Sequence, residues 1–224
     1  MARRNIQETM ASTSVLSINA ETRRRRIRLA TSMALYGGAL GAATILISLL
    51  NRTPFGTDPE HLRLIDSVFV SLSGGIAGIL VALPLGYYMG AMSGARPTNL
   101  FVWWAVGLAF GVAMSFMTGA LVPVSLVFED LSVGLIQPGQ VFERLLDAVF
   151  RAPLNLFVHG SLSMFTGLLA GSLFGTGGWV VDMFNTSSRP VAANVGPWAI
   201  ALILGFAVVV IAVFGSPDAL AKLG

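Results

Sequence analysis

Long apolar stretches alternate with short polar segments along this chain. Five of these stretches contain no Lys, Arg, Asp or Glu, and they cover residues 31–50, 67–92, 100–128, 155–181 and 195–215. Each is long enough to cross a hydrocarbon core of about 30 Å, which takes about 20 residues in a helix. Helices and closed barrels are the structures that satisfy every backbone polar group in lipid, and no alternating strands are visible. The pattern therefore predicts an all-α, polytopic transmembrane bundle of five spans.

The polar segments divide the chain into three parts. Residues 1–29 form an Arg-rich tail, residues 30–215 a single transmembrane helical domain, and residues 216–224 a short C-terminal tail. The polar tail before the first apolar stretch is too long for an ordinary signal peptide, and the stretch itself has the length of a span. We therefore expect the first span to be retained.

One polar segment carries a helical pattern of its own. Between residues 141 and 151 the apolar and charged positions fall on opposite faces of a helix. The apolar set is Phe142, Leu145, Leu146, Val149 and Phe150, and the charged set is Glu143, Arg144, Asp147 and Arg151. We expect an amphipathic helix that lies on the outer face of the membrane and ends where Pro153 breaks it. Within this helix we expect an ion pair between Arg144 and Asp147.

Charge asymmetry predicts the orientation. With the N-terminus inside, the inner segments hold nine Arg and three acids, and the outer segments hold four Arg, one Lys and eight acids. Positive residues beside a span favour the cytoplasmic side, so we expect an inner (plasma) membrane protein with a cytoplasmic N-terminus. The same Arg run could suggest a nucleic-acid surface, but next to a membrane helix it favours contact with the lipid bilayer.

The membrane interface has its own candidate residues. We expect anchors at the inner interface, where arginines meet lipid headgroups and tryptophans form an aromatic belt. The predicted anchors are Arg23, Arg24, Arg25, Arg26, Trp103, Trp104, Trp179 and Trp198.

Two segments of the chain are similar to each other. "RLIDSVF" at 63–69 resembles "RLLDAVF" at 144–150, and each precedes a span that begins with "SLS". The alignment matches Gly78 with Gly167 and Gly86 with Gly175. It suggests a parallel two-helix repeat, in which spans one and two correspond to spans three and four; the alternative is that two Leu- and Gly-rich helices look alike.

Glycines recur at four-residue spacing in three of the spans. In lipid there is no net hydrophobic attraction between helices, so small residues at i, i+4 favour association by close backbone approach. This glycine zipper pattern predicts helix packing, either inside the chain or with partner subunits or other copies. The residues are Gly74, Gly78, Gly86, Gly90, Gly107, Gly111, Gly167, Gly171 and Gly175.

Candidate chemistry in the spans is sparse. No charged residue is expected to be buried, whereas ion-coupled transporters usually keep one at membrane depth. His159 is the ionisable residue in a span, as a packing histidine, a haem or chlorophyll ligand, or a catalytic base; His61 is the second histidine. With no cysteine and no metal-binding or phosphate-binding motif, no cofactor is indicated and no metal site is expected.

Ser73 before Gly74, and His159 followed by "GLLAG", locally resemble the Ser and His helices of rhomboid intramembrane proteases. The resemblance implies a dyad in which Ser73 is the nucleophile and His159 the base. It covers these two segments alone, and an upstream His/Asn segment and a sixth helix are missing.

Three functions follow from these patterns. We expect a non-catalytic structural or accessory subunit of a larger membrane complex, with other membrane subunits or copies of itself as partners and no nucleic acid. The alternative is a small transporter or channel component for an uncharged or hydrophobic solute. A rhomboid-like serine protease is the third hypothesis.

Overall fold

A computed structural model describes residues 2–50, 64–93, 98–162 and 164–214. Within these ranges it describes the side chains of 19–47, 69, 71–93, 98–157 and 164–214. The regular elements of these ranges are all helical, which confirms the predicted all-α fold. They are α1 (Ala2–Leu50), α2 (Leu64–Ser93), α3 (Leu100–Ser132), η3 (Pro138–Gln140), α4 (Val141–Leu162), α5 (Met164–Asn185) and α6 (Pro190–Phe214).

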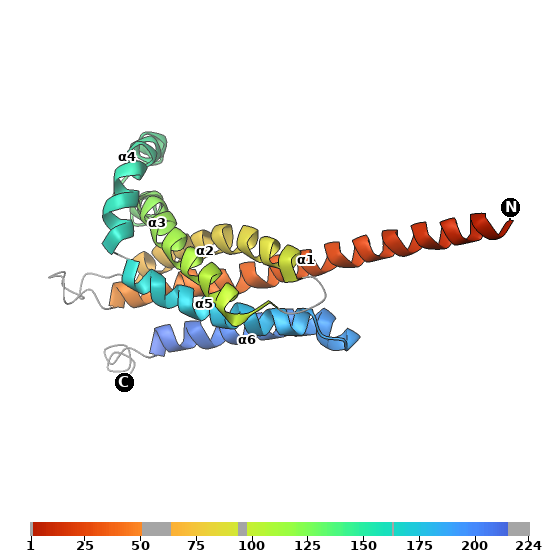
Figure 1. Ribbon diagram of the computed structural model, residues 1–224. Helices are drawn as coiled ribbons and strands as arrows, with labels where there is room; N and C mark the ends of the chain where they lie inside the picture. The colour runs from red at the N-terminus through yellow and green to blue at the C-terminus, as the bar shows by residue number, and fades with distance from the viewer. Residues whose placement is uncertain (1, 51–63, 94–97, 163, 215–224) are drawn as a thin grey trace.

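Five of the described helices, α1, α2, α3, α5 and α6, are long and apolar enough to cross a membrane. They form the bundle, and α4 stands away from it at one end (Figure 1). We call this the α4 end. At the opposite end α2 and α5 finish, α3 and α6 begin, and α1 carries the run of arginines 23–28. We call this the arginine end.

Helix α1 is much longer than a span. Its 49 residues extend about 74 Å at 1.5 Å per residue, and its first part projects beyond the arginine end (Figure 1). Among the residues of α1 whose side chains are described, a stretch within Asn19–Ile47 is long and apolar enough to cross a membrane. The helix therefore continues from the span into the polar tail without a break.

The boundary between α4 and α5 differs from the prediction. Helix α4 runs through Pro153 to Leu162, and the spanning helix α5 extends from Met164 to Asn185. The expected break at Pro153 is thus wrong. Proline removes a single backbone hydrogen bond, and its ring lies on the exposed side of α4, where the helix can accommodate it.

The apolar face of α4 is divided between two environments. Leu145 and Ala148 pack with Val127 of α3, whereas Phe142 and Phe150 are exposed. The ion pair of this helix also differs from the expected Arg144–Asp147 pair, because Arg151 Nε lies 2.9 Å from Asp147 Oδ1. The predicted amphipathic helix is present, and α3 covers one edge of its apolar face.

Aromatic rings fill the centre of the bundle. Phe174 of α5 is fully buried and stacks on Phe110 of α3, with ring centroids 4.1 Å apart. On α1, the ring of Tyr36 lies parallel to Phe174 at 6.2 Å. The Tyr36 hydroxyl donates to the carbonyl oxygen of Leu173, 2.9 Å away, so the polar tip of this buried ring is satisfied.

Helices α1 and α2 meet along glycines. A Cβ atom added to Gly78 would lie 2.1 Å from the carbonyl oxygen of Gly37, and one added to Gly41 would lie 2.0 Å from that of Gly74. Towards the arginine end, Gly90 leaves similarly little room before the backbone of Arg26. The backbones of the two helices are therefore close over most of the length of α2.

Helices α3 and α5 meet in the same manner. A Cβ atom at Gly111 would lie 2.2 Å from the carbonyl oxygen of Gly167, and one at Gly107 would lie 2.2 Å from that of Gly171. The glycines at four-residue spacing thus face each other inside this chain. These contacts account for much of the predicted glycine pattern without a partner subunit.

The two glycine contacts can be compared with the proposed repeat. Gly41 faces Gly74 in the first pair of helices, and Gly111 faces Gly167 in the second. The first pair also has a contact between Gly37 and Gly78, and matching it to the contact between Gly111 and Gly167 agrees with the alignment of Gly78 with Gly167. The contacts are therefore compatible with the aligned register and with one shifted by a helical turn.

Candidate functional site

A buried carboxylate lies near the arginine end of the bundle. Asp182 belongs to the last turns of α5, and its solvent exposure is 0%. Glu129, near the end of α3, is also buried. The expectation that no acid is buried is therefore wrong. The apolar stretch of the sequence ends at residue 181, but α5 continues through Met183 and Phe184 to Asn185, so Asp182 lies within the helix.

One oxygen of Asp182 accepts three hydrogen bonds. The donors are the backbone N–H of Thr98 at 3.2 Å, the hydroxyl of Thr98 at 2.8 Å and the indole N–H of Trp103 at 3.2 Å. A buried carboxylate without such donors would be costly, and hydrogen bonds to an ionised acceptor are stronger than neutral ones. Asp182 thus connects α5 to the beginning of α3.

The local sequence explains why these donors are available. Helix α3 begins at Leu100 after Asn99, whose side-chain oxygen caps the helix by accepting from the N–H of Phe101. Thr98 precedes the cap, and its N–H is outside the helical ladder. The carboxylate of Asp182 therefore lies beside the first turn of α3, where the helix dipole favours a negative charge.

Trp103 differs from its predicted place in an aromatic belt. Its ring is fully buried, and its N–H is used by Asp182. The fold makes room for the ring at Gly178, where an added Cβ atom would lie 2.3 Å from it. Trp104 and Trp198 are exposed, and Trp179 packs partly against the core.

A second polar network surrounds Arg28 of α1. Its guanidinium donates to the side-chain oxygen of Asn185 on α5 at 3.3 Å and to that of Asn194 on α6, and it lies 3.5 Å from Glu21. Arg25 Nε lies 3.1 Å from the same Glu21 oxygen. The planar guanidinium of Arg28 carries several N–H donors and can bond to several acceptors at once. It therefore connects α1, α5 and α6.

The end of α5 links both networks. Asp182 and Asn185 are one helical turn apart; the first bonds to α3, and the second bonds to Arg28 and, through its amide N–H, to the carbonyl oxygen of Arg25. This turn thus fastens α5 to α1 and α3, and Arg28 extends the connection to α6. We call Asp182, Asn185, Arg28, Thr98 and Trp103 the helix clamp. Its hydrogen bonds hold the arginine end in one arrangement.

The clamp residues carried a weak signal in the sequence. Asp182 follows "GTGGWVV" and precedes two more apolar residues, so the sequence is compatible with a helix that continues to Asn185. The partners of Asp182 lie about eighty residues away, and no spacing rule relates them.

The predicted Ser–His dyad is described in part. Ser73 lies on α2, is buried with 4% exposure and already takes part in an interaction within the structure. The side chain of His159 and the whole of His61 lie outside the described residues. In the described part of the chain, no three His, Cys, Asp or Glu side chains gather as they would around a metal ion.

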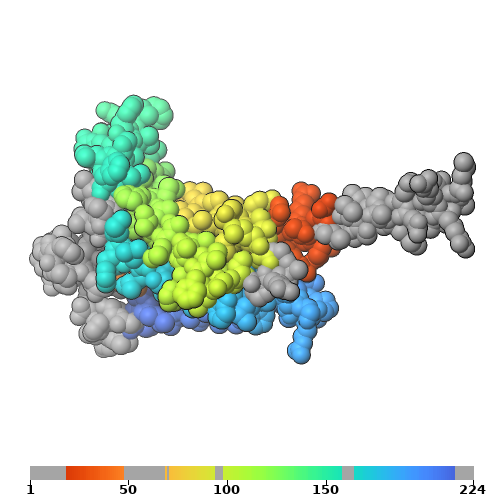
Figure 2. Space-filling view, in the orientation of Figure 1, coloured from red at the N-terminus to blue at the C-terminus, as the bar shows by residue number. Residues whose placement is uncertain are grey.

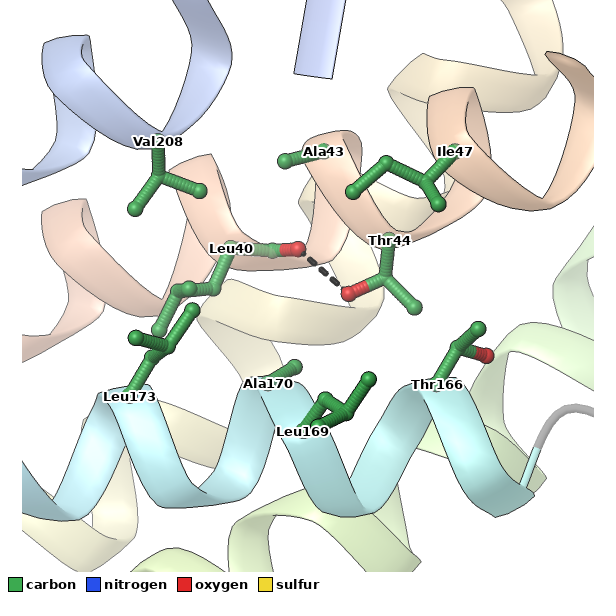
Figure 3. Close-up of a pocket in the computed structure, with 9 residues that line it drawn as sticks. All are labelled: Leu40, Ala43, Thr44, Ile47, Thr166, Leu169, Ala170, Leu173 and Val208. Carbon is green, nitrogen blue, oxygen red and sulfur yellow. Dashed lines mark hydrogen bonds between the residues drawn. The ribbon is translucent and has the colours of Figure 1, made fainter. Parts of the chain in front are cut away.

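An apolar pocket of about 70 Å³ lies between α1, α5 and α6. Figure 3 shows Leu40, Leu173 and Val208 pointing into it, with the hydroxyl of Thr44 turned to the carbonyl oxygen of Leu40 at 2.7 Å. An engineered apolar cavity of about 150 Å³ holds benzene. This pocket has about half that volume, and its lining is apolar except for Thr44 and Thr166.

Comparison with known proteins gives no relative: no family model matches this chain, and neither a curated protein nor a solved structure matches it.

Proposed function

We propose that this chain is a non-catalytic subunit of a larger membrane assembly. The observation that carries this proposal is the helix clamp. The ionisable groups Asp182 and Arg28 are engaged with groups from other helices, so they serve to fix the bundle. A rigid bundle whose outer faces carry large apolar side chains suits a subunit that positions neighbours in the membrane.

A small transporter or channel component is the second candidate, and the pocket between α1, α5 and α6 favours it. The pocket opens on the side of the bundle that carries Leu169 and Leu173, which are half-exposed. Its volume of about 70 Å³ is small for a solute path. We therefore place this function second.

Native mass measurement after gentle detergent extraction tests the subunit proposal. We expect the 23.6 kDa chain to be recovered in a complex of fixed mass that contains at least one other polypeptide. A photoreactive phenylalanine placed at the exposed Phe150 or Phe206 should cross-link to that polypeptide. The same group at the buried Phe174 is the matched control and should react within the chain.

A chain that is extracted as a monomer and cross-links to lipid at every exposed position contradicts the subunit proposal. If such a monomer also carries a measurable flux of an uncharged solute in liposomes, the transporter function replaces it.

We also propose that the N-terminus lies in the cytoplasm, as the excess of arginine at the arginine end favours. The chain contains no cysteine, so one introduced cysteine reports on one site. Gln140→Cys, exposed in η3 at the α4 end, should react with an impermeant thiol reagent in intact cells. Ser188→Cys, exposed at the arginine end, should react after the cells are opened. The reverse pattern would invert the orientation.

A further inference from the structure

Four of the five arginines near the arginine end of α1 fall into two sets, and the fifth, Arg26, is half-buried beside α2. Arg25 and Arg28 are half-buried and form ion pairs with Glu21. Arg23 and Arg24 are exposed, and among the described side chains neither forms an ion pair. In the first set Arg28 fastens α1 to α5 and α6, and Arg25 forms its ion pair within α1. The second set faces the surroundings.

The contacts of α2 with α1 show where Arg23 and Arg24 lie along the bundle. Gly90 of α2 packs against the backbone of Arg26, and the exposed rings of Tyr87 and Tyr88 lie within one turn of Gly90. Exposed tyrosines at the end of a span mark the level of the lipid headgroups. Arg23 and Arg24 are about 3–5 Å farther out along α1 than Arg26, which is the depth of the phosphates.

The charge around this pair is positive. Glu21 is the acid one turn or less from the pair, and it is engaged by Arg25 and Arg28. Asp182 is enclosed in the helix clamp. Figure 2 shows this part of α1, in red, at the surface of the arginine end beside α2. Guanidinium groups bind phosphate oxygens through paired hydrogen bonds, so a phosphate is the ligand that suits this surface.

We propose that Arg23 and Arg24 form a binding site for the phosphate of an anionic phospholipid headgroup. The site is separate from Arg28 of the helix clamp. Each arginine near an anionic surface contributes about 1 kcal/mol of attraction, so losing both should weaken binding about 30-fold.

The experiment uses the full chain in non-ionic micelles, with bound lipids counted by native mass measurement. Phosphatidylglycerol should bind more tightly than phosphatidylcholine. Arg23→Gln with Arg24→Gln should lose about 30-fold in phosphatidylglycerol affinity while keeping the thermal unfolding midpoint. Arg144→Gln with Arg151→Gln removes the same charge from exposed positions of α4 and should leave the affinity unchanged.

A third variant separates the two sets of arginines. Arg25→Gln with Arg28→Gln should lower the unfolding midpoint and keep phosphatidylglycerol binding in the folded fraction, because it removes the Arg28 hydrogen bonds of the helix clamp and both ion pairs with Glu21. Equal loss of affinity in all three double variants would overturn the proposal, since it would reflect net charge. Displacement of the lipid by millimolar inorganic phosphate or by single-stranded RNA at lipid-like concentrations would also overturn it, in favour of a free-phosphate or nucleic-acid site.

Discussion

Asp182→Ala is expected to lower the free energy of unfolding by about 3 kcal/mol, the largest effect of any single substitution considered. The change leaves the N–H and hydroxyl of Thr98 and the indole N–H of Trp103 without their acceptor. An unsatisfied buried donor costs about 1–3 kcal/mol, and water near the interface recovers part of this sum. Unfolding in mixed micelles of increasing denaturing detergent measures the effect.

Asp182→Asn is the matched control, because its amide oxygen still accepts hydrogen bonds. We expect it to cost about 1 kcal/mol, less than the alanine variant. The double variant Asp182→Ala with Trp103→Phe tests the contact itself. Residues that share a hydrogen bond give non-additive effects, so the double variant should be less destabilised than the sum of the two single variants. Additive effects would show that this hydrogen bond contributes nothing to stability.

Gly78→Ala should destabilise the bundle by about 2 kcal/mol relative to Gly75→Ala. The added methyl group at Gly78 would lie 2.1 Å from the carbonyl oxygen of Gly37, a backbone atom that cannot move without separating α1 from α2. Overpacking of this kind costs about 1–3 kcal/mol. The same detergent-unfolding measurement compares the two variants.

Gly75 offers a close control because it is in the same helix, one turn from Gly78. A methyl group there would lie 3.6 Å from the carbonyl oxygen of Gly38, which is an ordinary contact. Both variants gain the same helix propensity of about 1 kcal/mol from alanine, so that term cancels in the comparison. Equal stability of the two variants would mean that α1 and α2 are not held as close as the structure places them.

Gly171→Ala tests whether a methyl group added between α3 and α5 destabilises the bundle as one added between α1 and α2 does. Its methyl group would lie 2.3 Å from the carbonyl oxygen of Gly107 on α3. A loss similar to that of Gly78→Ala would show that the two glycine contacts are equivalent in energy as well as in geometry. That result would support the proposed repeat independently of the sequence alignment.

The candidate site was less predictable than the fold, and Asp182 shows why. A charged residue at the end of an apolar stretch is typical both of a loop and of a helix end that another helix covers. Which applies depends on whether donors such as Thr98 and Trp103 lie opposite it, and these are far away in the sequence. Trp103 was misplaced for the same reason, since the exposed Trp104 beside it has nearly the same sequence environment.

The sequence by itself determined the elements and their class. Five apolar stretches free of charge predict five helices long enough to cross a membrane, because lipid offers the backbone no other hydrogen-bonding partner. The glycine spacing likewise specified faces that tolerate close approach. Only the tertiary structure decided which faces meet, that α4 continues through Pro153, and that Asp182 and Arg28 fasten the arginine end. Periodicity describes one helix at a time, whereas contacts, burial and the satisfaction of polar groups depend on pairs of helices.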